Sequence, residues 1–365
     1  MKYLDEFRDP ELAKGLVQKV NEAAARLDRP VHIMEICGGH TVAFCKYGIH
    51  GLLQEHVRLV SGPGCPVCVT PGAVIDEALW LAEQPGVKLF TFGDMLRVPG
   101  SKGTLMEAGQ RGEKVQMMYS PLQAVEYAEA HPERTTILLG VGFETTAPVL
   151  GAAILAAAER GLDNFFYRSA GKLTPPAMRA LLDDPETILD GFIAPGHVTT
   201  IIGADAYGFI GEEYGKPSVV SGFELCDVLD SLARILNQLA EGRHEVEIQY
   251  TRSVTKEGNL KAQALLERVF RIVDDAWRGL GTIPDSGHAL SEEFKKYDVR
   301  QRWKIPEFKA QEPPNCRCGE VLKGICIPPE CPLFGKACTP AHAVGPCMVS
   351  SEGSCAAYFK YGIRK

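Results

Sequence analysis

Seven of the twelve cysteines in this 365-residue chain lie in one stretch near its end. They follow the pattern Cys316-x-Cys318-x7-Cys326-x4-Cys331-x6-Cys338-x8-Cys347-x7-Cys355. Sets of four thiolates bind zinc or iron–sulfur clusters. Structural zinc sites usually present two Cys-x2–4-Cys pairs, and here only Cys326 and Cys331 have such a spacing. The wide spread favours a cubane cluster, whose four irons are separated in space. Zinc, and inert or disulfide-bonded cysteines, are the alternative interpretations.

Seven thiols exceed the four ligands that one cluster needs. Cys316 and Cys318 flank a single residue, so in an extended turn their side chains point the same way. One of them can hold the cluster while the other faces a redox partner thiol. A cluster beside a thiol pair would divide a two-electron disulfide exchange into single-electron steps.

Two further cysteine motifs lie near the N-terminus. Cys37 is followed by two glycines, which let backbone N–H groups approach a ligand closely. His40 comes next, and it could serve as a base, a metal ligand or a hydrogen-bond donor. Cys65 and Cys68 form a Cys-Pro-x-Cys unit, which keeps two sulfurs within disulfide reach and is typical of thiol oxidoreductases. The alternative for Cys37 is a buried, inert thiol. The alternative for Cys65 and Cys68 is half of a zinc site. Cys45 and Cys226 carry no motif and are interpreted as core residues.

The elements that position these residues are predicted to be βα units. Short Val/Ile/Leu-rich runs bounded by Gly and Pro alternate with helical stretches, which is typical of parallel strands covered on both faces. A first helix begins with Asp9 as its cap and Pro10 in its first turn. The expected strands are 31–37, 57–62, 87–93, 136–142, 164–170, 191–195 and 218–222, with a further one at 245–250. The other expected helices are 73–83, 121–129, 148–160, 175–182, 224–241 and 260–277.

The unusual polar and Gly-rich motifs stand where the predicted strands end. Ligands of open α/β sheets bind beyond the carboxyl ends of the strands, so these motifs predict a cleft between two α/β domains. Gly and Pro also make ordinary turns, and acidic residues at such places also cap helices. The weaker candidates of this kind are Asp94, Glu144, His197 and Glu224.

The elements and motifs together predict three units. They are an α/β domain at 1–118, a second α/β domain at 119–243 and a smaller Cys-rich domain at 244–365.

Composition excludes several classes of protein. A net charge of −7 offers no basic surplus for nucleic acid. No apolar run approaches the roughly 20 residues that cross a bilayer, and the charged start lacks the apolar core of a signal peptide. We therefore expect a cytoplasmic protein, where cysteine clusters bind metal rather than form disulfide scaffolds.

Five motifs together resemble the HypD family of [NiFe]-hydrogenase maturation proteins. They are EICGGHT at 35–41, GPGCPVC at 62–68, GFETTAP at 142–148, PGHV at 195–198 and CPLFGKACTP with GPCMVSSEGSCAAY within 331–358. The resemblance spans nearly the whole chain. It implies a protein that works with HypC-type partners and a HypE-type cyanide donor to assemble the Fe(CN)2CO unit.

The resemblance also implies a role for each site residue. Cys37 would be a ligand of the iron under assembly, with His40 and Thr41 lining its site, and Cys65 and Cys68 would be the redox-active pair. A [4Fe–4S] cluster would be held by the four cysteines Cys316, Cys331, Cys338 and Cys355. Cys318 and Cys347 would form a second thiol pair beside it, as in ferredoxin:thioredoxin reductase. Cys326 fits neither role.

Three functions are therefore weighed. The first is a redox-active assembly scaffold rather than a turnover enzyme. The second is a [4Fe–4S]-dependent protein disulfide reductase of the ferredoxin:thioredoxin reductase type. The third is a zinc-stabilised α/β binding module, which would be colourless.

Overall fold

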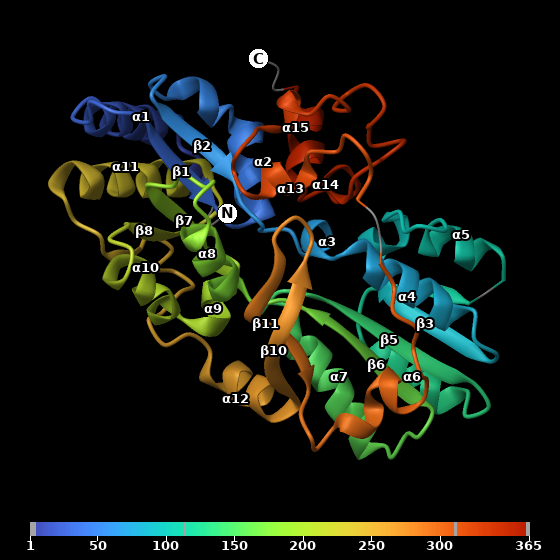
Figure 1. Cartoon of the computed structure of the whole chain (residues 1–365). Helices are drawn as coiled ribbons and strands as arrows, with labels where there is room; N and C mark the ends of the chain where they lie inside the picture. Colours follow the sequence, from blue (N-terminus) through green and yellow to red (C-terminus); the bar gives the residue numbers. More distant parts are fainter. Residues whose placement is uncertain (1–4, 113, 310–311, 363–365) are drawn as a thin grey trace.

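A computed structural model describes residues 5–112, 114–309 and 312–362 and contains two parallel sheets (Figure 1). Sheet A has the strand order β2-β1-β7-β8-β9. Its strands are β1 (Val31–Glu35), β2 (Val57–Ser61), β7 (Gly191–Pro195), β8 (Ser218–Ser221) and β9 (Val246–Ile248). Sheet B has the order β4-β3-β5-β6. Its strands are β3 (Val87–Phe92), β4 (Val115–Met118), β5 (Thr135–Gly142) and β6 (Phe165–Gly171).

Helices cover both faces of each sheet, as the continuous apolar strands predict. On sheet A, α1 (Pro10–Ala24) and α11 (Leu225–Glu241) lie side by side over one face (Figure 1). The opposite face packs against α8 (Thr174–Asp183) and α10 (Gly208–Glu212). On sheet B, α6 (Leu122–Ala130) and α7 (Ala147–Glu159) cover one face, and α4 (Gly72–Ala82) and α5 (Leu105–Gln110) cover the other.

The remaining helices lie in the connections and in the Cys-rich tail. Within the described ranges no helix is long and apolar enough to cross a membrane. The connecting helices are α2 (Gly38–Tyr47), α3 (Pro66–Val69), α9 (Gly196–Ile202) and α12 (Leu260–Val269). The tail carries α13 (Cys318–Leu322), α14 (Pro346–Val349) and α15 (Ser354–Tyr361). In Figure 1 the tail, in red, covers α2 and α3, which follow the first two strands of sheet A.

Most predicted elements are present within about two residues of their expected bounds. Asp9 caps α1 as predicted, since its Oδ1 accepts hydrogen bonds from the N–H groups of Glu11 and Leu12 at 2.8 and 2.9 Å. The prediction of a helix across 260–277 is wrong beyond Val269. The chain there forms β10 (Phe270–Trp277), which pairs antiparallel with β11 (Gly281–Leu290). Pairing with β11 therefore determines the conformation of residues 270–277, and the β-branched residues Ile272 and Val273 favour a strand there.

The two sheets draw strands from separate stretches of the chain. Sheet A combines β1 and β2 with three strands that follow residue 190, and sheet B occupies the chain between them. The expected limit at 118 therefore falls inside sheet B, between β4 and β5. The domain limits at 118 and 243 stay predictions, whereas the α/β class with parallel sheets and a Cys-rich C-terminal region is confirmed.

Candidate functional site

The first two βα turns of sheet A bring the N-terminal cysteine motifs together. Cys37 follows β1 and Cys65 follows β2, and these strands are parallel neighbours. The N–H of Gly38 donates to the carbonyl of Gly64 at 3.1 Å. A Cβ on Gly64 would lie 2.3 Å from the backbone nitrogen of Cys37. Glycine is therefore required for the two turns to touch.

Cys37 stands at the N-terminus of α2, over a buried carboxyl group. Its carbonyl accepts from the N–H of His40 at 2.8 Å, and its own N–H donates to Glu35 Oε2 at 2.8 Å. Thr41 Oγ1 donates to the other oxygen of Glu35. Burial raises the pKa of Glu35 to about 8 and that of the Cys37 thiol to about 12. Cys37 is therefore a neutral thiol near pH 7, and a metal cation that replaced its proton would supply the positive charge that a buried thiolate needs.

His40 is buried and held in place by an aromatic stack. Its Nε2 lies 3.0 Å from the carbonyl of Gly222, so Nε2 carries the proton. Burial lowers its pKa to about 4, which keeps the ring neutral. The ring stacks on Phe223 at 4.5 Å, and Phe223 stacks on His197 at 4.0 Å. The Cys37 and Pro-Gly-His motifs are thus joined through Phe223, to which the sequence assigned no role.

Cys65 and Cys68 form a disulfide, with their Cα atoms 5.3 Å apart. Pro66 occupies the first turn of α3 and both sulfurs are buried. Cys68 Sγ lies 4.0 Å from the carbonyl of Pro346, the residue before Cys347. The disulfide therefore borders the tail as well as the Cys37 turn.

Six of the seven tail cysteines line one enclosed cavity. They are Cys316, Cys318, Cys331, Cys338, Cys347 and Cys355, accompanied by apolar residues including Leu333, Phe334 and Met348. Cys318 is close enough to Cys316 and Cys347 for the three thiols to influence one another's ionisation. Burial raises the pKa of Cys355 well above that of a free thiol. The six thiols come from turns and short helices up to 39 residues apart in the chain, so only the folded tail brings them together.

Arg278 connects this cavity to the turn that carries the disulfide. Its backbone N–H donates to Val69 at 2.8 Å and its Nε donates to the carbonyl of Thr70 at 3.0 Å. Its positive charge opposes the rise in the pKa of Cys318. Sequence reasoning missed Arg278, because the residue lies between β10 and β11, in a stretch whose first strand was predicted to be helical.

Glu352 is the second residue that sequence reasoning missed. A Cβ on Gly38 would lie 2.3 Å from the Glu352 carbonyl oxygen, so the tail also touches the Cys37 turn. The charge of Glu352, after burial, contributes to the raised pKa of Cys37. The tail thus contacts both N-terminal cysteine motifs.

The remaining cysteines and acidic candidates have other surroundings. Cys326 is outside the six-thiol cavity, on the wall of another pocket. Cys45 and Cys226 are buried in the core, which confirms that interpretation. Glu144 accepts hydrogen bonds from the N–H and Oγ1 of Thr174 at 2.7 and 2.8 Å, where α8 begins. Asp94 and Glu224 bind Arg97 and Arg8, so these three carboxylates have structural partners.

Comparison with known proteins gives the family. The HypD model, described as "Hydrogenase formation hypA family", matches residues 11–362. The chain belongs to the HypD family. It is 44% identical over 370 residues to "Hydrogenase maturation factor HypD2" of Bradyrhizobium diazoefficiens, covering 99% of this chain and 97% of that protein. It is 46% identical over 369 residues to "Hydrogenase maturation factor HypD" of Azotobacter vinelandii, with coverage of 99% and 97%.

A third HypD protein is equally well covered. The chain is 42% identical over 366 residues to "Hydrogenase maturation factor HypD" of Escherichia coli, with coverage of 99% of this chain and 98% of that protein. The HypD match includes every cysteine motif described above, since the matched range extends from α1 to the end of α15.

Proposed function

We propose that this protein is a hydrogenase maturation factor that serves as scaffold and redox component in the assembly of the Fe(CN)2CO centre. It would act with a HypC-type chaperone and a HypE-type cyanide donor, in the reducing cytoplasm. One observation carries the proposal. The Cys37 turn, the Cys65–Cys68 disulfide and the six-thiol cavity form a continuous series of contacts.

Cys37 would bind the iron under assembly, which is substrate rather than resident cofactor. A thiolate is a suitable ligand for low-spin iron with cyanide and CO. Gly38 and Gly39 carry no side chains, which lets the Glu352 backbone and the Phe223 ring pack closely against the Cys37 turn. Glu35 and Thr41 lie beneath the turn and hold its backbone. The neutral His40 packs behind it and adds no charge.

Cys65 and Cys68 would supply the electrons that cyanide transfer needs. Reduction of a protein thiocyanate requires two electrons and gives a thiolate and cyanide. Oxidation of the two thiols to the disulfide releases two electrons and two protons. The structure holds the pair in its oxidised form, so each cycle must be followed by re-reduction of this disulfide.

The tail is suited to a resident [4Fe–4S] cluster, with Cys316, Cys331, Cys338 and Cys355 as its ligands. The fit rests on the donor set, since six thiols surround one enclosed and mainly apolar space. Among the described residues no three His, Cys, Asp or Glu side chains converge as on a single ion. Cluster ligands bind separate irons and need no such convergence. A bound cluster would supply one-electron transfer, while Cys318 and Cys347 remain as a thiol pair.

Infrared spectroscopy of the protein purified anaerobically with its HypC-type partner tests the iron assignment. We expect cyanide and CO stretches in the complex, and their loss in Cys37→Ala. Cys45→Ala is the matched control, because Cys45 is buried outside both cysteine sites. Persistence of the bands in Cys37→Ala would refute the assignment. Normal cyanide transfer by Cys65→Ala would refute the redox role of the Cys65–Cys68 pair.

The disulfide reductase alternative is less well supported by the geometry. Cys65 and Cys68 are only 3% and 0% exposed, so a substrate protein disulfide cannot reach either sulfur without movement of the surrounding turns. A protein that reduces such a substrate steadily, yet never shows cyanide and CO bands, would favour the alternative.

A further inference from the structure

The turn between β10 and β11 carries a buried charge to which the proposed function gives no role. The Arg278 guanidinium donates from Nε to the carbonyl of Thr70 at 3.0 Å and from Nη1 to Glu312 at 2.6 Å. Its Nη2 is buried and has no hydrogen-bond partner among the described residues. Because buried donors are almost always paired, Nη2 is suited to an acceptor that binds beside it.

This turn packs directly on the helix that begins with Cys318. A Cβ on Gly279 would lie 2.5 Å from the Cα of Gly319, so the two backbones touch. Gly279 also has a φ of 78°, in the left-handed region that favours glycine. Arg278 and Cys318 each precede one of these two glycines. The contact therefore places Arg278 behind the wall of the six-thiol cavity.

The charge of Arg278 reaches two of the cavity thiols. Neighbouring thiols and burial have the largest effects on the pKa of Cys318 and of Cys347, and the positive charge of Arg278 lowers the pKa of both. The Glu312 side chain, which neutralises Arg278, is 52% exposed. Solvent screens an exposed charge more than a buried one. The net potential of this ion pair at the two thiols is therefore positive.

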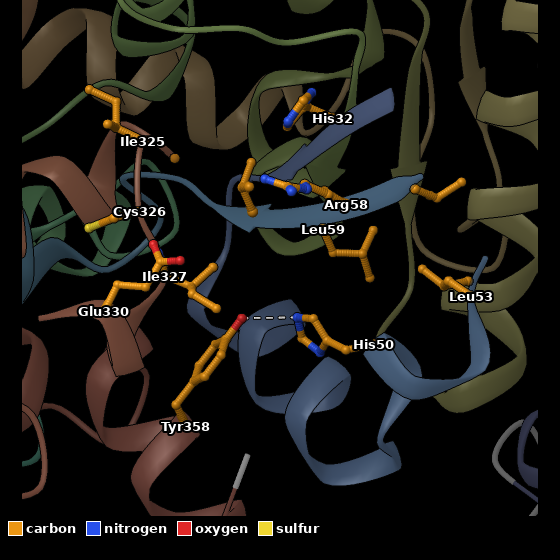
Figure 2. Close-up of a pocket in the computed structure, with 13 residues that line it drawn as sticks. His32, His50, Leu53, Arg58, Leu59, Ile325, Cys326, Ile327, Glu330 and Tyr358 are labelled. Carbon is orange, nitrogen blue, oxygen red and sulfur yellow. Dashed lines mark hydrogen bonds between the residues drawn. The ribbon is translucent and has the colours of Figure 1, made fainter. Parts of the chain in front are cut away.

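Arg317 also borders the cavity, but its charge is paired and partly solvated. Its Nε donates to Glu320 at 2.8 Å, and its Nη1 lies 3.4 Å from the carbonyl of Glu330. Glu330 belongs to the separate pocket that Figure 2 shows together with Cys326. The Arg317 side chain is 34% exposed, against 4% for Arg278. Arg317 is therefore a matched comparison for the buried charge.

Arg278 also holds the turn that carries the disulfide. Its backbone N–H donates to the carbonyl of Val69 at 2.8 Å, and its Nε bonds to the next residue along the chain. Helix α3, which carries Cys68, contacts α14, which carries Cys347. One residue thus binds the segment of the disulfide on one side and packs beside the cavity on the other.

We propose that Arg278 is a positioning residue that raises the reduction potential of a cluster in the six-thiol cavity and holds this cavity against the disulfide turn. The inference rests on the proposed function, because it requires that cluster. One-electron reduction adds a negative charge to the cavity and neither forms nor breaks a bond. A buried guanidinium favours the added charge, and Nη2 would donate to an anionic sulfur. Net charge and hydrogen bonds to sulfur are among the factors that set the potentials of iron–sulfur clusters.

An EPR-monitored dithionite titration of the anaerobically purified protein measures this potential. We expect Arg278→Gln to shift the one-electron equilibrium at least about tenfold toward the oxidised form, a decrease of about 59 mV. Arg278→Lys keeps the charge and should restore most of the potential. Glu312→Gln removes the opposing charge and should raise the potential, a sign that structural damage would not produce. Arg317→Gln is the matched control and should shift the equilibrium less than about threefold.

Hydrogen exchange of residues 66–72, followed by mass spectrometry, tests the holding role without any signal from the cluster. Arg278→Lys loses the planar group that bonds to Thr70 and Glu312 together. We expect exchange in this segment to be at least about tenfold faster in Arg278→Lys and unchanged in Arg317→Gln. Exchange equal to that of the wild-type protein would refute the holding role.

The outcomes separate this inference from the proposed function. An unchanged potential in Arg278→Gln, with the iron and sulfide content of the wild-type protein, would overturn the inference and leave the proposed function intact. A lower potential in Glu312→Gln would equally overturn it, also where Arg278→Gln fails to fold. A wild-type protein without iron and inorganic sulfide would refute the cluster assignment itself, and the inference with it.

Discussion

Gly64→Ala tests whether the close packing of the two N-terminal cysteine turns is needed for function. The added Cβ would lie 2.3 Å from the nitrogen and 2.5 Å from the Cα of Cys37. Carbon atoms approach ordinarily to about 3.5 Å, so the turns must separate by roughly 1 Å. Backbone atoms cannot rotate away as a side chain can. Overpacking of this kind costs about 1–3 kcal/mol of unfolding free energy.

The separation should affect function more than stability. It would break the hydrogen bond from Gly38 to Gly64 and move Cys37 away from Cys65. A misplacement of about 1 Å can lower a reaction rate about 100-fold. We therefore expect Gly64→Ala to remain folded in urea titrations, with a lower midpoint. Its complex with the HypC-type partner should lose the cyanide and CO infrared bands.

Gly15→Ala is the matched control. Gly15 lies within α1 and a Cβ there would meet no atom within 4 Å. Alanine in a helix interior should raise the unfolding free energy by roughly 0.5–1 kcal/mol and leave the infrared bands intact. If Gly64→Ala kept the stability and the bands of the wild-type protein, the tight packing of the two turns would have no functional role, and this reasoning would be refuted.

Three further changes test the packing and the electrostatics. Asp9→Ala removes the cap of α1 and should lower the unfolding free energy by about 1 kcal/mol in urea titrations; an unchanged midpoint would contradict it. Glu77→Gln removes the carboxylate paired with the Arg168 guanidinium, which is only 12% exposed, and should cost about 3–5 kcal/mol. A loss below about 1 kcal/mol would show that the other carboxylates near Arg168, Asp275 and Asp298, compensate for its charge. Burial raises the pKa of Glu144 to about 7. Between the ordinary carboxyl pKa and about pH 7, the folded state therefore binds a proton that the unfolded state does not. Because of this residue, the free energy of unfolding falls as pH rises through that window. Glu144→Gln should remove that slope, up to roughly 3 kcal/mol, as urea midpoints at pH 5 and pH 8 would show; an identical slope in both proteins would mean that Glu144 is ionised throughout.

Local sequence patterns predicted much of this fold because their causes are local. Continuous apolar runs indicated parallel strands, and Asp9 with Pro10 indicated the start of α1. The helix predicted through 277 failed because β10 is stabilised by its pairing with β11 rather than by its own pattern. Likewise, β4 lies in a polar stretch with no strand signal, and its pairing with β3 made it a strand.

The sequence by itself determined the chemistry of the site, since the identity and spacing of Cys37, Cys65 and Cys68 indicated thiol chemistry at the ends of strands. Only the tertiary structure decided which groups meet. Contacts between distant segments placed the tail against both turns, brought Arg278 to the thiols and put Cys326 on a different pocket. Such contacts follow from the packing of whole sheets and helices, which no local spacing encodes.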